Sequence, residues 1–175
     1  MTTFIEIQQE FGRCCRANDG MSCIFTRTLN DGTRKMIANR LNQYAAQLDW
    51  NRVIGLVDVS KRHDATAGIL VCDTKAYFYG GRNKPQKVWY DEVSRIAILR
   101  TEEGFDYGVK FELDSNADYL WKCDVVDCEA ITKLIKSIKR INRGRGIQPS
   151  QSGVRERSCW NRSRRPDRRE QGRRQ

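Results

Sequence analysis

The chain has 175 residues, of which 39% are hydrophobic and 31% charged, and its formal net charge is +10. This length favours one domain with extensions, and the absence of a run of ~18 apolar residues excludes a membrane-spanning helix. The charge is unevenly distributed, because residues 143–175 hold eleven arginines and three acids and so carry +8 of the total. Residues 1–142 are therefore nearly neutral, and the basic character belongs to the C-terminal tail.

The N-terminal 32 residues give a weak pattern. Thr3 and Glu6 have the spacing of a capping box, which predicts a short helix ending near Arg16. Two Asn-Asp-Gly turns, at 18–20 and 30–32, bracket the stretch MSCIFTRTL, which favours a single strand. We expect residues 1–32 to be a poorly defined N-terminal extension.

A helix and a series of strands are predicted from residue 33 onward. The helix spans residues 33–49, because its apolar residues recur at helical spacing. The strands are RVIGLVDVS, AGILVCD, AYFYG, KVWYDEV and RIAILR. In the first of these, Val53, Val57 and Val59 are expected to share one face with Gly55.

The last two strands alternate most clearly. Val109 and Phe111 lie on one face of residues 107–113, and Tyr119 and Trp121 lie on one face of residues 117–125. This period of two predicts half-buried antiparallel strands. A helix follows, which Asp127 is placed to cap, and its apolar stripe comprises Ile131, Leu134, Ile135, Ile138 and Ile141. The predicted class is α+β: a helix, about seven antiparallel strands and a C-terminal helix.

The segment VIGLVDVS…TAGILVCDTKAYFYG…QKVWYDEVSRIAIL resembles the bacterial pleckstrin-homology-like (PH-like) domains. In those domains a strand ending in Asp precedes a strand of the pattern glycine, three apolar residues, Thr or Cys, then Asp. A strand with Tyr, an acid, Glu and Ile or Val comes later, and Tyr90-Asp91-Glu92-Val93 fits it. The resemblance covers about residues 33–142. It implies a seven-stranded barrel closed by the C-terminal helix, and a binding or scaffolding module with neither a catalytic set nor a cofactor.

Catalytic and metal-binding residues are not indicated by the sequence. His63 is the only histidine, and it lies in the polar stretch SKRHDAT. Cys72 lies within an apolar strand pattern, which favours a buried and inert thiol over a nucleophile paired with His63. The seven cysteines do not form the two closely spaced pairs that hold a tetrahedral metal ion. Their odd number, and an N-terminus without the features of a signal peptide, predict free thiols in the cytoplasm.

One candidate anion site lies in the loops between strands. The stretch GGRNK lacks the Gly-Lys-Ser/Thr ending of a phosphate-binding loop, so we interpret it as a hairpin turn. By position, the resemblance implies an anion or lipid-headgroup site, for which ordinary solvated loops are the alternative. Its residues are Lys61, Arg62, Arg82, Lys84 and Lys87.

The tail allows three interpretations. As a nucleic-acid-binding arm, its arginines would neutralise phosphates with little base specificity, and RNA suits such an arm better than DNA. The tail is also similar to the C-terminal arginine signals of type IV secretion substrates, or it is a composition without a function. The residues of the nucleic-acid hypothesis are Arg155, Arg157, Arg162, Arg164, Arg165, Arg168, Arg169, Arg173 and Arg174. With few apolar residues, the tail is predicted to be disordered alone.

Together these observations favour a non-enzymatic, cytoplasmic interaction domain that binds a protein partner through a strand edge or beside its C-terminal helix. The tail would add affinity for polyanions, including weak affinity for an anionic membrane surface. The principal alternative is an accessory protein that binds RNA or DNA. A near-neutral body argues against that alternative, because dedicated nucleic-acid-binding domains carry a basic face.

Overall fold

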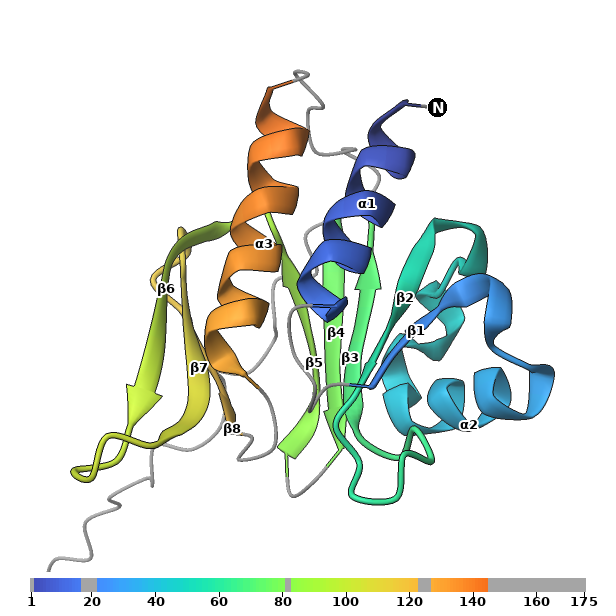
Figure 1. The fold of residues 1–175 in the computed structure, drawn as a ribbon, viewed down its shortest axis with the longest axis horizontal. Helices are drawn as coiled ribbons and strands as arrows, with labels where there is room; N and C mark the ends of the chain where they lie inside the picture. Colours follow the sequence, from blue (N-terminus) through green and yellow to red (C-terminus); the bar gives the residue numbers. More distant parts are fainter. Residues whose placement is uncertain (1, 17–21, 81–82, 123–126, 145–175) are drawn as a thin grey trace, which may run out of the picture.

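The computed structural model describes residues 2–16, 22–80, 83–122 and 127–144 (Figure 1). The helices are α1 (Thr2–Arg16), α2 (Asp31–Leu41) and α3 (Cys128–Arg143), and 3₁₀ turns span Thr26–Thr28, Asn42–Gln47 and Trp50–Arg52. The first five strands are β1 (Ser22–Phe25), β2 (Val53–Asp58), β3 (Gly68–Cys72), β4 (Lys75–Gly80) and β5 (Asn83–Trp89). They are followed by β6 (Val93–Arg100), β7 (Asp106–Leu113) and β8 (Asp118–Lys122).

The strands form two antiparallel sheets. One has the order β1-β2-β3-β4-β5, and the other has the order β6-β7-β8. The α+β class and the C-terminal helix are confirmed, but among the described residues no strand pairing joins the two sheets into a closed barrel. Gly80 pairs with Asn83 across the turn between β4 and β5. This pairing confirms that GGRNK forms a hairpin.

The main core lies between the two sheets and beneath α1 and α3. Phe78 of β4 is central to it, because its ring lies 5.1 Å from that of Phe111 and 5.4 Å from that of Trp121, centroid to centroid. The apolar stripe of α3 contributes Ile131, Leu134, Ile135 and Ile138, all of which are buried in this cluster. Figure 1 shows α1 and α3 side by side on one side of the molecule. The sheets therefore depend on one shared set of aromatic and aliphatic contacts.

A second apolar cluster covers the other face of the five-stranded sheet. Ile37 and Leu41 of α2 pack there with Leu56, Leu70 and other buried residues of β2–β4. The predicted helix over residues 33–49 is shorter than expected. Asn42 takes a left-handed φ of 49°, which ends α2, and the chain continues as a 3₁₀ turn.

A bulge in β2 changes which residues share a face. Val53 pairs with Cys72 and Gly55 with Val71, so Ile54 is an extra residue in the ladder. As a result Ile54 and Val57 face the main core, and Val53 faces the second cluster. The expectation that Val53 shares a face with Val57 is wrong for this reason.

The N-terminal segment packs onto the rest of the molecule. The predicted helix to Arg16 is confirmed as α1, and its Ile7 and Phe11 are fully buried in the main core. The stretch after the first Asn-Asp-Gly turn contributes β1, which pairs with β2. Residues of this expected extension therefore belong to the packed body.

The cysteines do not all share one state. Cys14 and Cys72 carry free thiols, as predicted. Cys23 is disulfide-bonded, so the expectation of free thiols is wrong at this position.

Candidate interaction surface

One flank of α3 runs antiparallel to β6. Near the start of the helix, Nη2 of Arg100 at the end of β6 lies 3.6 Å from Oε1 of Glu129. Near the end of the helix, Nζ of Lys139 donates a hydrogen bond to the backbone carbonyl of Val93, the first residue of β6. Residues at helical spacing between these two points, Thr132 and Lys136, lie on the same flank. Strand and helix are thus in contact at both ends.

β6 is an edge strand with eight residues. It pairs with β7, and no other strand of the described residues pairs with its second edge. Its sequence, VSRIAILR, contains neither proline nor glycine. Ile96 and Ile98 are partly buried against the core, which fixes the strand in place. An edge of this kind presents backbone N–H and C=O groups that a further strand can pair with.

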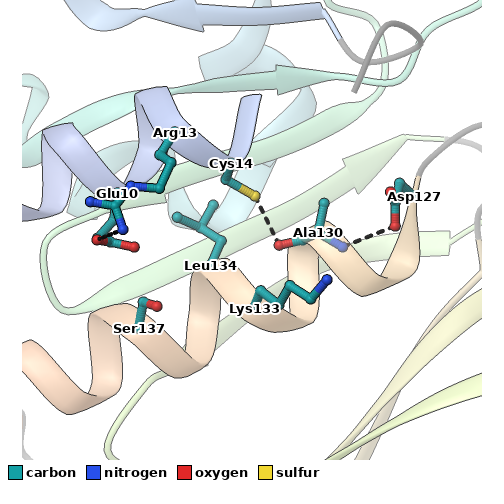
Figure 2. A pocket seen from close by; sticks show the side chains of 8 residues that line it. All are labelled: Glu10, Arg13, Cys14, Asp127, Ala130, Lys133, Leu134 and Ser137. Atoms are coloured by element: carbon teal, nitrogen blue, oxygen red, sulfur yellow. Dashed lines mark hydrogen bonds and ion pairs between the residues drawn. The ribbon is translucent and has the colours of Figure 1, made fainter. Parts of the chain in front are cut away.

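The opposite flank of α3 forms a pocket with α1 (Figure 2). The pocket has a volume of about 430 Å³ and is lined by Glu10, Arg13, Cys14, Asp127, Ala130, Lys133, Leu134 and Ser137. It is formed on one side by α1 and on the other by the first half of α3. Two acidic and two basic residues line the pocket, so its charge favours neither an anionic nor a cationic ligand.

Cys14 lines this pocket, and its thiol joins α1 to α3. Its Sγ donates to the backbone carbonyl of Ala130 at 2.9 Å. Burial, followed by the nearby carboxylates of Asp127 and Glu10, raises the pKa of the thiol to about 11. At neutral pH the thiol is protonated, and it serves as a contact between α1 and α3.

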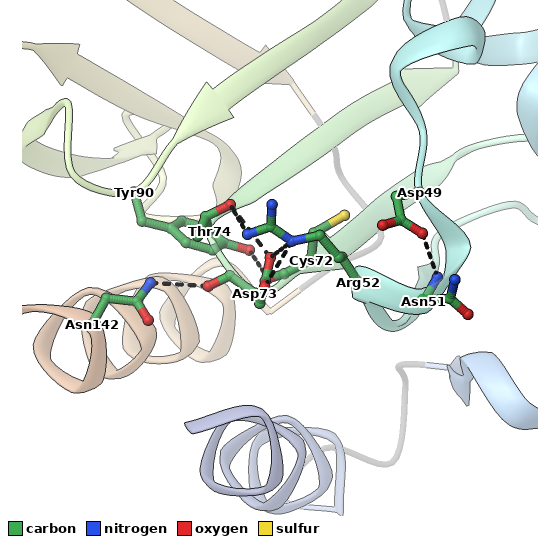
Figure 3. Close-up of polar contacts among 8 residues, drawn as sticks. All are labelled: Asp49, Asn51, Arg52, Cys72, Asp73, Thr74, Tyr90 and Asn142. Atoms are coloured by element: carbon green, nitrogen blue, oxygen red, sulfur yellow. Dashed lines mark hydrogen bonds and ion pairs between the residues drawn. The ribbon is translucent and has the colours of Figure 1, made fainter. Parts of the chain in front are cut away.

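A polar network ties the turn between β3 and β4 to both β2 and α3 (Figure 3). Nε of Arg52 donates to both carboxylate oxygens of Asp73, at 3.1 and 2.9 Å. Nδ2 of Asn142 near the end of α3 donates to the backbone carbonyl of Asp73 at 2.9 Å. The hydroxyl of Tyr90 donates to the carbonyl of Cys72 at 3.1 Å. These contacts position α3 against the five-stranded sheet, as Lys139 does against β6.

The β2–β3 loop is organised around Asp58, whose side chain is buried. Its Oδ1 accepts from the backbone N–H of Ser60 at 2.8 Å and from the Ser60 hydroxyl at 2.6 Å, and its Oδ2 accepts from the N–H of Ala65 at 2.9 Å. His63 and Ala65 take left-handed backbone conformations, with φ of 53° and 59°. The loop therefore has a defined shape that leaves Lys61 and Arg62 exposed to solvent.

The structure describes four of the five predicted anion-site residues. The β2–β3 loop and the β4–β5 hairpin lie at the same end of the sheet, because Asp58 pairs with Gly68 and Gly68 with Tyr79. Lys84 is exposed at that end. Lys87 instead pairs with Tyr77 further along the strand, and its Nζ donates to Oε1 of Gln47 at 3.0 Å. Arg82 lies outside the described residues.

The tail arginines, from Arg155 to Arg174, also lie outside the described residues. The hypotheses on nucleic acid and on secretion therefore rest on the sequence alone.

His63 and Cys72 do not form a Cys–His pair. His63 lies in the loop before β3, whereas Cys72 is the last residue of that strand and is 2% exposed. Burial raises the pKa of the Cys72 thiol to about 12. Among the described residues no three His, Cys, Asp or Glu side chains are grouped to hold a metal ion.

No protein-family model, curated protein or solved structure matches the chain. The helices of the described ranges include none with the length and apolar character needed to cross a membrane. The functional argument therefore depends on the geometry of the chain itself.

Sequence reasoning missed the two features that distinguish this surface. β6 was predicted as a strand, but an edge position is a property of the sheet order and has no local signal. The contacts of Lys139 and Asn142 were missed because both side chains donate to backbone carbonyls, which any residue type offers. The only sequence signal for these contacts is the presence of a lysine and an asparagine near the end of an amphipathic helix.

Proposed function

We propose that this protein is a non-enzymatic interaction module that binds an extended segment of a partner protein along the free edge of β6, next to α3. The observation that carries the proposal is the combination of an eight-residue edge strand with a helix fixed to both of its ends. A bound segment would pair its backbone with β6 and place alternate side chains against α3. The edge of β6 and the helix α3 are already in position before a partner binds, which lowers the entropic cost of binding.

The other sheet edges are less suited to pairing with a further strand. β5 contains Pro85, which has no N–H to donate, and two lysines, and both residue types discourage pairing at an edge. β1 has four residues and β8 has five, against eight in β6. The edge of β6 therefore offers the most backbone for pairing.

A PH-like architecture is part of the proposal. Four consecutive antiparallel strands, β2–β5, are followed by three more, β6–β8, and then by α3, which is the order that the resemblance implies. The quoted stretch Tyr90-Asp91-Glu92-Val93 forms the corner between the two sheets. Tyr90 is fully buried there, and the N–H of Asp114 donates to the carbonyl of Glu92 at 2.8 Å. β1 and α1 are additions to that order.

Selection of short displayed peptides against the full chain, followed by amide hydrogen exchange, tests the binding mode. We expect selected peptides to slow exchange at alternate β6 amides, those that point away from β7. Slowed exchange confined to β5 or to the β2–β3 loop would contradict the proposal.

Two charge reversals on one helix provide a matched comparison. Lys136→Glu alters the flank beside β6, whereas Lys133→Glu makes the same change in charge at the pocket beside α1. We expect the first variant to weaken peptide binding several-fold more than the second, because only the first lies beside the bound segment. Equal effects would show that overall charge, and not this flank, determines binding.

Nucleic-acid binding by the tail is a second candidate function, which the charge distribution favours. Residues 143–175 carry +8, and a cationic segment gains affinity for polyanions by releasing their counterions. Filter binding of single-stranded RNA to the full chain and to a chain ending at Arg143 tests this. We expect truncation to remove most of the affinity and to flatten its salt dependence; unchanged binding would assign the affinity to residues 1–143.

A further inference from the structure

Two lysines converge on one tryptophan on the face of the five-stranded sheet that the second apolar cluster covers. Nζ of Lys75, at the start of β4, lies 4.6 Å from the ring centroid of Trp89. Nζ of Lys87, on β5, lies 5.5 Å from the same ring. Trp89 is the cross-strand neighbour of Lys75, and Tyr77 is that of Lys87, so the sheet register places both lysines beside the indole.

The surroundings of the two lysines are aromatic and polar. Lys87 lies 5.5 Å from the ring centroid of Tyr44, in the 3₁₀ turn after α2, and Lys75 lies 5.5 Å from that of Tyr77. The ring of Tyr77 is fully buried, and its hydroxyl has no hydrogen-bond partner in the described part of the chain. Flat rings therefore surround the two ammonium groups, and Lys87 donates a hydrogen bond to the uncharged Oε1 of Gln47 at 3.0 Å.

The carboxylates of Asp73 and Glu92 act on Lys75 and Lys87, respectively, only from beyond ion-pair distance. Among the described residues no carboxylate lies within ion-pair distance of Lys75 or Lys87. Asp73, the nearest acid in sequence, is engaged by Arg52 at 2.9 Å. Both lysines are half-buried, and burial, with Lys87 contributing, lowers the pKa of Lys75. Holding two like charges in a partly desolvated place costs free energy that a bound anion would recover.

We propose that Lys75 and Lys87 form a binding site for a phosphate-bearing anion, at the surface between β4, β5 and the turn that follows α2. A phosphate oxygen suits this place because ammonium groups donate strong, charge-assisted hydrogen bonds to it. Trp89 and Tyr44 offer flat apolar surfaces for an attached planar group. The phosphate of a nucleotide and free pyrophosphate share the required chemistry. The site is separate from the edge of β6 and does not depend on the function proposed there.

The experiment compares two double variants of the full chain with equal net charge. Lys75→Gln with Lys87→Gln removes the site, whereas Lys35→Gln with Lys122→Gln removes two exposed lysines that belong to neither candidate anion site. Binding of pyrophosphate and of ADP is measured by titration calorimetry at physiological salt. Any contribution from the tail is common to all three proteins, so the difference between variants reports on the site alone.

We expect the Lys75/Lys87 variant to bind at least about tenfold more weakly than the wild type, because two charged hydrogen-bond donors are lost. The Lys35/Lys122 variant should bind as the wild type does. Tighter binding of ADP than of pyrophosphate would identify the aromatic rings as part of the site, and equal binding would restrict it to the phosphate. Absence of measurable binding to the wild type, or equal losses in both variants, would overturn the proposal. Far-ultraviolet circular dichroism confirms that each variant is folded.

Discussion

The two sheets of this protein differ in how much of their surface is covered. Every residue of β2 and β3 is buried, because apolar clusters cover both faces of the five-stranded sheet. In the three-stranded sheet, β8 alternates between exposed and buried residues, and β6 contains one buried residue. The first sheet therefore carries most of the stability, and the second sheet has the backbone and side chains that remain available for contacts. Three pairs of substitutions test this division.

Phe78→Ala should have the largest effect, because this ring joins the two sheets. We expect a loss of about 3–5 kcal/mol in the free energy of unfolding, since the substitution leaves a cavity against Phe111 and Trp121. Urea denaturation measures the loss. Leu120→Ala, on the exposed face of β8, is the control and should change stability by less than ~0.5 kcal/mol. Similar losses for the two variants would show that the sheets do not share one core.

Gly55→Ala should have an intermediate effect on the covered sheet. A Cβ at this position would lie 2.6 Å from Cε1 of Phe11 and 2.7 Å from the backbone oxygen of Ile24, so α1 or β1 would have to move. We expect a loss of about 1–3 kcal/mol, measured by thermal unfolding. Gly144→Ala at the end of α3 meets its nearest atom at 3.4 Å and serves as the matched control. If Gly55→Ala were neutral, α1 would not be packed tightly on β2.

The smallest effects are expected for one ion pair in each sheet. Arg52→Gln removes the double contact with Asp73, and we expect it to cost up to about 1 kcal/mol because the pair is half-exposed. Arg100→Gln removes the contacts of Arg100 with Asp106 and Glu129 at the surface and should leave the urea midpoint unchanged. A larger effect at Arg100 would reverse the comparison and give the three-stranded sheet a structural role of its own.

Local patterns were sufficient to predict much of the secondary structure. The side chain of Asp127 accepts from the N–H of Ala130 at 2.9 Å and caps α3 as predicted. Tyr119 and Trp121 are buried between exposed neighbours, which confirms the alternation in β8. These features depend on residues within a few positions of one another, so the sequence displays them directly.

The remaining features depend on contacts between distant segments. The only local signal of the bulge at Ile54 is Gly55, because glycine within a strand marks either a bulge or the close approach of another segment, and the sequence does not distinguish the two. The grouping of Lys75 with Lys87 follows from the pairing of Lys75 with Trp89, and hence from the register of the hairpin. The predicted anion site assigned Lys87 to a loop because position in the sequence was the only guide. Sheet order and register depend on contacts between distant segments, so the local pattern of a single sequence does not predict them.

The attachment of α3 has a consequence for how this protein tolerates mutation over time. Asn142 and Lys139 both donate to backbone oxygens, at positions 73 and 93. The backbone carbonyl oxygen at position 93 is present in all twenty amino acids, so substitutions there leave the hydrogen bond from Lys139 available. A substitution that removes the side-chain donor at position 139 or 142, in contrast, removes the hydrogen bond itself. In a collection of variants, we expect position 93 to vary among the apolar residues that fit the main core, where Val93 is buried, without loss of the contact with Lys139.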